Sequence, residues 1–304
     1  MNNPDAGIQP DWNGKRVLVS GGTGFIGSAL TRRLIELNAH VGVVTRTQPT
    51  AKSVEWIKVD QKNSFPSEEI EQFHPNTVIH LATLFKADHE TSDIQPLIRS
   101  NIEFGTHLLE SAKRLGAVFV NISSSWQHFD GRAYSPVSLY AATKQAFLDI
   151  AHYYAETGVD FRNLTIYDTY GPDDQRNKIV SQLLKSGIQG QGIDMGPGDQ
   201  LINLLFLEDV ISAILHIATL PQTTEPMALD YVVRTENSIT IRELAETIEQ
   251  VVNCNLGARW GVRLSRPREM TTDWRFGQVL PGWEQRVSLA EGIQTCWQEL
   301  NSAT

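Results

Sequence analysis

The sequence predicts an α/β fold built on a doubly wound parallel sheet, with a smaller lobe toward the C-terminus. Short β-branched apolar runs alternate with longer stretches whose apolar residues recur every three or four positions, from residue 15 to residue 166. Glycines at 21, 24 and 27 stand directly between the first such run and the first helical stretch. After Tyr170-Gly171-Pro172 the alternation gives way to glycine-containing loops and separate helices.

The predicted strands are short, and several are apolar throughout, as in sheets that are covered on both faces. Residues 1–12 are expected to form a flexible tail, 13–171 a dinucleotide-binding domain and 172–304 a substrate-binding lobe, with about 201–220 returning to the main domain. Ser/Thr-x-x-Glu capping boxes, Thr240 with Glu243 and Ser288 with Glu291, mark two helix starts in the lobe. Strands are expected over Arg16–Ser20, His40–Thr45, Val54–Val59, Thr77–Leu81, Val118–Ile122 and Phe161–Ile166, and the main helices over Phe25–Leu37, Leu97–Leu115 and Leu139–Thr157.

Composition excludes several classes of protein. A net charge of -9 over 304 residues disfavours nucleic-acid binding, which needs a basic surface. No stretch approaches the roughly 20 apolar residues of a membrane span, and the polar start of the chain does not resemble a signal peptide. Two cysteines, Cys254 and Cys296, are too few for a disulfide framework, and no Cys or His spacing suits a metal. We therefore expect a metal-free cytoplasmic protein.

The glycine-rich turn predicts a dinucleotide site. Glycines at this point allow a tight turn, a close approach of the backbone to pyrophosphate and close packing of helix on strand. The helix that follows offers backbone amides and a partial positive charge. A glycine-rich turn alone is weak evidence for a nucleotide site, and the position of this turn between a strand and a helix strengthens that evidence. The predicted contacts to the cofactor are Gly21, Thr23, Gly24, Phe25, Ile26 and Gly27.

The end of the second predicted strand favours NADP(H) over NAD(H). An NAD site normally has a carboxylate there for the ribose hydroxyls, whereas this chain has Thr45 and Arg46. A guanidinium can pair bidentately with the 2'-phosphate, although an exposed arginine would also be ordinary. Asp60, after the third strand, is a candidate acceptor for the adenine amino group or simply a strand-end aspartate.

Tyr140 and Lys144 are the predicted centre of the chemistry. A spacing of four residues places both side chains on one helix face. A phenol has a pKa near ~10, so it needs a nearby cation to act as an acid and base at neutral pH. Lys144 can supply that charge and hold the nicotinamide ribose. Such pairs occur by chance on many helices, and the preceding dinucleotide loop makes the catalytic interpretation the favoured one.

Three serines follow the fifth predicted strand, at the sheet edge where ligands bind in such folds. One hydroxyl is expected to hydrogen-bond the substrate oxygen, with Ser124 preferred over Ser123. Ser125 and Trp126 come next as substrate contacts. Trp126 would either stack on the ligand or pack at the sheet edge.

Together these motifs resemble the extended short-chain dehydrogenase/reductases, in the branch that modifies nucleotide sugars. The resemblance covers residues 15–301 and includes Val78-Ile79-His80-Leu81-Ala82, Gly105-Thr106, Tyr170-Gly171-Pro172 and Phe206-Leu207-Glu208-Asp209-Val210. It implies a Rossmann fold, a nucleotide-sugar substrate and a homodimer formed through the Tyr140 helix. It further implies that Leu81, Ala82 and Asn101 line the cofactor, beside Thr83, and that Asp168, Asn177 and an arginine near Arg268 face the substrate. Because the chain is acidic overall, an anionic ligand must be held by local cations, and the candidates are Arg46, Arg176, Lys178, Arg266 and Arg268.

Departures from the family pattern narrow the predicted reaction. The Asp-Glu pair that dehydratases of this branch use beside the catalytic hydroxyl is replaced by serines. Arg46 suggests an exchangeable NADPH. We therefore predict NADPH-dependent reduction of the 4-keto group of a nucleotide-linked 4-keto-6-deoxyhexose, as in 4-ketoreductases that form CDP-abequose or dTDP-fucose. The alternatives are a 4-epimerase or 4,6-dehydratase with tightly bound NAD, and a non-catalytic NADP(H) sensor.

Two other departures concern the substrate pocket. Trp126-Gln127 replaces the usual Val-Tyr after the serines. Leu201-Ile202-Asn203 replaces a segment that carries an arginine for the diphosphate in many relatives. We therefore expect an unusual nucleotide pocket.

Overall fold

A computed structural model describes residues 11–49, 51–59, 65–221 and 230–302. Its centre is an eight-stranded sheet with the order β14-β11-β6-β5-β4-β1-β2-β3, in which every neighbouring pair is parallel. The predicted doubly wound α/β fold is confirmed. The strands are β1 (Arg16–Ser20), β2 (His40–Thr45), β3 (Glu55–Lys58), β4 (Thr77–His80), β5 (Val118–Ser124), β6 (Phe161–Ile166), β11 (Asp230–Val233) and β14 (Gln278–Val279).

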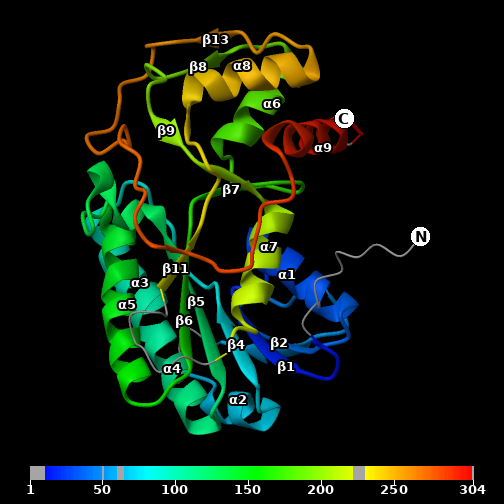
Figure 1. The fold of residues 1–304 in the computed structure, drawn as a ribbon, viewed down its shortest axis with the longest axis vertical. Coiled ribbons are helices and arrows are strands. Elements are labelled where there is room, and N and C mark those ends of the chain that lie inside the picture. Colours follow the sequence, from blue (N-terminus) through cyan, green and yellow to red (C-terminus); the bar gives the residue numbers. More distant parts are fainter. Residues whose placement is uncertain (1–10, 50, 60–64, 222–229, 303–304) are drawn as a thin grey trace.

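Helices cover both faces of this sheet (Figure 1). On one face α1 (Phe25–Glu36) and α7 (Leu207–Ile217) pack on the strands through an apolar cluster that includes Leu30, Leu34 and Ile214. On the other face α2 (Ser67–Phe73), α4 (Phe104–Leu115) and α5 (Leu139–Glu156) share a second cluster around Phe119 and Phe147. Strands buried on both faces explain the continuous apolar runs in the sequence.

The helix expected over Leu97–Leu115 is interrupted. The chain forms α3 (Ile94–Ile98), then a π-helical turn over Arg99–Glu103, and only then α4. Asn101 lies in that turn, and its amide bonds the loop after β4. Such turns inside helices are frequent at functional sites. Apolar spacing cannot reveal this turn, because the flanking helices keep the helical period.

A smaller apolar core lies beyond the carboxyl ends of the strands. It is built from α6 (Ile179–Gln189), α8 (Ile241–Val252) and α9 (Leu289–Ser302), with Leu183, Leu244 and Ile293 fully buried. Both predicted capping boxes are formed, at Thr240 and at Ser288. The short parallel pair β7 (Asp168–Tyr170) and β10 (Leu204–Phe206) adjoins this core, and the pairs β8 (Ile193–Asp194) with β13 (Ala258–Arg259) and β9 (Leu201–Ile202) with β12 (Ile239–Thr240) complete the lobe.

Helix α7 binds residues 281–287, the segment that leads from the sheet to α9. The buried Asp209 carboxylate accepts the backbone N–H groups of Arg286 (2.9 Å) and Val287 (3.0 Å). One turn later Ser212 accepts a hydrogen bond from the Trp283 indole (2.8 Å), and His216 contacts the carbonyl of Pro281 (2.7 Å). This face of α7 thus holds residues 281–287 against the helix. No helix in the described residues has the length and apolarity needed to cross a bilayer.

We predict that Asp209→Ala lowers the free energy of unfolding by about 3 kcal/mol. The substitution removes two hydrogen bonds from backbone amides to a buried carboxylate and leaves both amides without their acceptor. Urea denaturation measures the change. The control is Glu208→Ala, at the exposed neighbouring position; equal effects of the two substitutions would contradict the proposed fastening role.

Candidate active site

The turn between β1 and α1 has the geometry of a pyrophosphate cradle. Gly21 has φ +72°, and a Cβ there would lie 2.7 Å from the amide nitrogen of Ala82. A Cβ on Gly27 would lie 2.1 Å from the carbonyl oxygen of Gly21. Gly24 precedes α1 and has no side chain to cap the helix. The glycines therefore let the turn, the start of α1 and the loop after β4 pack backbone to backbone, and the first amides of α1 are available for a dinucleotide phosphate.

At the end of β2 the chain offers hydroxyls and a cation instead of a carboxylate. The Oγ1 atoms of Thr23 and Thr45 lie 3.4 Å apart, which connects the glycine-rich turn to this strand end. Arg46 is exposed directly after β2. Asp60, the predicted adenine contact, lies outside the described residues.

Asn101 fixes the loop that follows β4. Its side-chain oxygen accepts hydrogen bonds from the backbone N–H of Leu84 (2.7 Å) and the hydroxyl of Thr83 (3.2 Å). Its amide donates to the carbonyl of Leu84 (3.0 Å) and to Thr143 on α5 (2.9 Å). At the start of the loop, the N–H of Leu81 donates to the carbonyl of Ser20, and that of Ala82 to its hydroxyl. The predicted cofactor residues 81–83 are therefore held beside the glycine-rich turn.

The three serines have different surroundings. Ser123 is buried, and its hydroxyl donates to the side chain of Asn163 (2.8 Å) and accepts from Asn121 (3.2 Å). Ser124 is half-buried and caps the short helical turn 125–127, accepting the N–H of Trp126 (3.3 Å). Ser125 is buried. Of the two candidate catalytic hydroxyls, that of Ser124 lies beside Tyr140, and that of Ser123 bonds within the sheet.

Tyr140 occupies the first turn of α5, which begins after the cap residue Ser138. Its side chain is 8% exposed. Burial raises the pKa of Tyr140 to about 12, hydrogen bonds with Ser124 and Thr83 oppose that rise, and the Asp168 charge adds to it. The predicted lowering of this pKa by Lys144 is wrong for the protein alone, because desolvation of the phenolate outweighs the other influences.

Lys144 lies one turn further along α5 and is 4% exposed. Burial lowers its pKa to about 8, because the ammonium loses solvation. At neutral pH Tyr140 therefore keeps its phenol proton and Lys144 keeps its ammonium charge, and both groups are buried. This is a suitable pair for delivering a proton to a substrate oxygen.

Charged residues line the approach from the smaller lobe. Burial raises the pKa of Asp168, while the Lys178 and Arg176 charges lower it. Burial also lowers the pKa of Lys178, which the Asp168 charge opposes. Arg176 lies over the ring of Phe25 at 4.0 Å and donates to the carbonyl of Thr169, which joins this segment to the start of α1. Asn177 is exposed in the same turn, at φ +55°.

Arg268 is bound to the protein itself. Its guanidinium donates to the carbonyl of Pro136 (3.0 Å) and the hydroxyl of Ser135 (2.6 Å) and lies 4.2 Å from the ring centroid of Phe129. Arg266, two residues earlier, is exposed, and its charge lowers the pKa of Lys178. Among the described residues no acceptor pairs with Arg266. The family resemblance implied an arginine near Arg268 for the diphosphate, and Arg266 lies two positions away from it.

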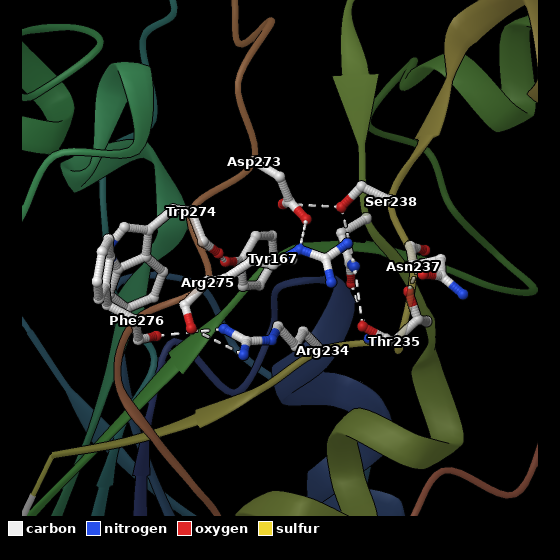
Figure 2. A network of polar contacts seen from close by, with 10 residues as sticks. Tyr167, Arg234, Thr235, Asn237, Ser238, Asp273, Trp274, Arg275 and Phe276 are labelled. Carbon is white, nitrogen blue, oxygen red and sulfur yellow. Dashed lines mark hydrogen bonds and ion pairs between the residues drawn. The ribbon is translucent and has the colours of Figure 1, made fainter.

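A strap, residues 266–276, carries these arginines from the smaller lobe back across the sheet edge. Figure 2 shows its anchorage: Arg234 donates to the carbonyls of Arg275 (2.9 Å) and Phe276 (3.2 Å), and Asp273 accepts from Ser238 (2.9 Å). Tyr167 also donates to the carbonyl of Trp274. The Trp274 ring stacks on His128 with centroids 3.7 Å apart.

Phe85 belongs to the site although the sequence analysis did not select it. The ring is 40% exposed and lies edge to face with Tyr140, at a centroid distance of 5.0 Å. Trp126 meets the same ring at 5.3 Å, and the Lys178 ammonium lies 4.1 Å from its centroid. The sequence signal that could have identified Phe85 is its position, three residues after the predicted cofactor contact Ala82. No cluster of three or more His, Cys, Asp or Glu side chains suitable for a metal occurs in the described part of the chain.

Comparisons with known proteins show which proteins this chain is similar to in sequence and in fold. CDP-abequose synthase of Yersinia pseudotuberculosis is 28% identical over 269 residues, which cover 87% of this chain and 94% of that protein. UDP-glucuronic acid decarboxylase 3 of Arabidopsis thaliana is 24% identical over 303 residues, covering 91% and 86%. The solved structure of UDP-glucuronic acid 4-epimerase from Bacillus cereus, in complex with UDP-glucuronic acid and NAD, has the same fold with a TM-score of 0.81, at 20% identity, over 95% of this chain and 99% of that one.

A sequence model of one protein family identifies the family of this chain. The model of the NAD dependent epimerase/dehydratase family matches residues 17–233, well over half of the chain. That span includes the glycine-rich turn, the serine run and the Tyr140–Lys144 pair. The predicted resemblance to extended short-chain dehydrogenase/reductases is confirmed, and the chain belongs to the NAD dependent epimerase/dehydratase family.

Proposed function

We propose that this protein is an NADPH-dependent reductase of the 4-keto group of a nucleotide-linked 4-keto-6-deoxyhexose. The placement of Tyr140 carries the proposal, since its hydroxyl interacts with Ser124 and Thr83 at the carboxyl edge of the sheet, beside the buried Lys144. The sequence motifs of the family alone do not distinguish reduction from epimerisation. A phenol that retains its proton at neutral pH favours the reductive direction, in which the enzyme must give a proton.

In the proposed reaction the ketone gains one hydride and one proton. NADPH, when bound, supplies the hydride to the ketone carbon. Tyr140 donates its phenolic proton to the oxygen as that oxygen becomes negative, and Ser124 donates a hydrogen bond to the same oxygen. The Lys144 ammonium stabilises the phenolate that results, and solvent then restores the proton on Tyr140.

Cofactor preference is assigned from the end of β2. Arg46 is the exposed cation there, and the neighbouring Thr23 and Thr45 present hydroxyls instead of a carboxylate. A 2'-phosphate on the cofactor would therefore pair with the guanidinium of Arg46 and would not be repelled by a carboxylate at this strand end. This supports NADP(H), and it favours a cofactor that leaves after each turnover over one that is retained.

Substrate binding is assigned to the face between the strap and α6. Lys178 and Arg266 interact electrostatically there and offer two cations to a nucleotide diphosphate. Asn177 is exposed beside them, and Asp168 faces the sugar side. Arg268 is assigned a supporting role, because its donors already bind Ser135 and Pro136. The name of the Yersinia pseudotuberculosis relative supports a nucleotide sugar as the substrate.

Assembly and location form the remaining part of the proposal. Tyr153 is 61% exposed on α5, the helix through which we propose that a homodimer forms. The cysteines at 254 and 296 are both free thiols, which supports a reducing compartment such as the cytoplasm.

A 4-epimerase is the competing assignment, because solved structures of similar fold are epimerases in complex with NAD. The cofactor content of the purified protein distinguishes the two. A reductase should be isolated without cofactor and consume NADPH in proportion to sugar reduced. Stoichiometric retained NAD, together with interconversion of C4 epimers without net cofactor use, would replace the proposed function by epimerisation.

We predict that Tyr140→Phe lowers kcat for NADPH-dependent reduction by at least about 100-fold, because it removes the proton donor. NADPH binding should be unchanged. The assay follows NADPH absorbance with a panel of CDP-, dTDP-, UDP- and GDP-linked 4-keto-6-deoxyhexoses. Tyr153→Phe, at an exposed position on the same helix, is the matched control. Undiminished turnover by Tyr140→Phe would remove this residue from the mechanism.

The pH dependence should follow Lys144. Its pKa of about 8 in the folded protein means that the ammonium is present below pH 8 and lost above it. Tyr140, with its pKa near 12, keeps its proton throughout this range. We therefore expect kcat/KM for reduction to be level below about pH 7.5 and to fall roughly tenfold per pH unit above pH 8.5. A pH profile that stays level to pH 10 would contradict this role.

Arg46→Asp should reverse the cofactor preference. The substitution replaces the cation proposed for the 2'-phosphate by a carboxylate, so the ratio of kcat/KM with NADPH to that with NADH should fall by at least about 100-fold. Arg114→Asp, at the end of α4, changes the net charge equally and serves as the control. A ratio that responds equally to both substitutions would show a general charge effect.

A further inference from the structure

An aromatic wall stands beside the proton donor and has no role in the proposed proton transfer. It consists of Phe85, from the loop after β4, and Trp126, from the helical turn after β5. Phe85 lies edge to face with both Tyr140 (5.0 Å) and Trp126 (5.3 Å). The two wall residues come from separate segments 41 positions apart and meet only at this sheet edge.

Hydrogen bonds and an ion pair of the neighbouring residues hold the two wall residues in place. The backbone N–H and C=O of Leu84, next to Phe85, both bond the side-chain amide of Asn101. Lys86, on the other side, forms an ion pair with Asp93 (3.1 Å). Trp126 is fixed through its carbonyl, which accepts the N–H of Val137 (2.8 Å). Phe85 is nevertheless 40% exposed, so this anchored loop presents apolar surface to the site.

The chemistry of the wall selects what can lie against it. An aromatic ring offers no strong hydrogen-bond partner, so a hydroxyl pressed on it would lose its water without replacement. A carboxylate could pair with Lys178, whose ammonium lies 4.1 Å from the Phe85 centroid. In the proposed function, however, that ammonium serves the nucleotide diphosphate, and the nearby Asp168 charge would repel a carboxylate placed against the wall. An uncharged apolar substituent suits the wall best.

We propose that Phe85, supported by Trp126, determines specificity by holding the C6 methyl group of the sugar. This rests on the proposed function, in which Tyr140 protonates the oxygen on C4. In a hexopyranose, C6 is attached to C5, which adjoins C4, so C6 lies close to the group that Tyr140 serves. In a 6-deoxy sugar this substituent carries no oxygen, and it therefore matches the apolar surface that Phe85 offers.

The test compares two alcohols that differ only in a hydroxyl on C6: a nucleotide-linked 6-deoxyhexose and the corresponding hexose with the same nucleotide and stereochemistry. The enzyme oxidises each with NADP⁺, and the ratio of the kcat/KM values is measured from NADPH formation. We expect the wild type to prefer the 6-deoxy sugar by about 100-fold, the size of discrimination that an apolar pocket achieves against an added hydroxyl.

Phe85→Ala should reduce that preference at least tenfold, and Phe85→Leu, which keeps an apolar side chain, should retain most of it. The control is Phe276→Ala, because Phe276 is another exposed phenylalanine, on the strap, 67% exposed. An unchanged ratio in Phe85→Ala would overturn the proposal. An equal loss in Phe276→Ala would overturn it as well.

A binding measurement separates this proposal from the proposed function. Calorimetry in the Tyr140→Phe background gives Kd for the same two nucleotide sugars, with and without Phe85→Ala. If no nucleotide sugar is turned over, the proposed reaction fails, and the ratio of the two Kd values alone decides the role of Phe85. A ratio that Phe85→Ala leaves unchanged overturns the role of Phe85 even where turnover is observed.

Discussion

The side chain of Asn101 is the interaction on which the geometry of the site depends. It bonds Thr83 and both backbone groups of Leu84 on one side and the hydroxyl of Thr143 on the other. Thr143 in turn donates to the carbonyl of Tyr140 (2.7 Å). A single buried amide therefore fixes the loop after β4 relative to the first turn of α5. The π-helical turn that carries Asn101 interrupts an otherwise regular helix, and the amide of this turn residue serves the neighbouring loop.

A second constraint is the close approach of backbone to backbone under the cofactor site. Positions 21 and 27 have no room for a Cβ, since one would meet Ala82 and the other the Gly21 carbonyl. The same packing brings the loop after β4 beside the start of α1. The residues predicted to contact the cofactor and the residues around Tyr140 are thus parts of one arrangement at the carboxyl edge of the sheet.

Charges of both signs meet in the site of a chain whose net charge is -9. The Lys178 and Arg176 charges lower the pKa of Asp168, and the Asp168 charge acts to raise the pKa values of Lys178 and Tyr140. Burial dominates each of these shifts, raising the pKa of the phenol and carboxyl and lowering that of the ammonium. A buried site of this kind favours neutral forms, and Lys144 keeps its charge at neutral pH only narrowly. The proposed reduction requires that charge together with a protonated phenol.

The sequence by itself determined strands β1 to β6 of the sheet, the glycine-rich turn, the capping boxes at Thr240 and Ser288, and the identity of the Tyr140–Lys144 pair, whereas it did not predict β11 and β14. These features depend on neighbours in the chain: apolar period, backbone freedom at glycine and a four-residue helical spacing. Tertiary structure decided the rest. It assigned different surroundings to Ser123 and Ser124, brought Phe85 and Trp126 against Tyr140, bound Arg268 to Ser135, and raised the pKa of a phenol expected to be acidic. Burial and contacts between distant segments cause these outcomes, and neither is encoded in local spacing.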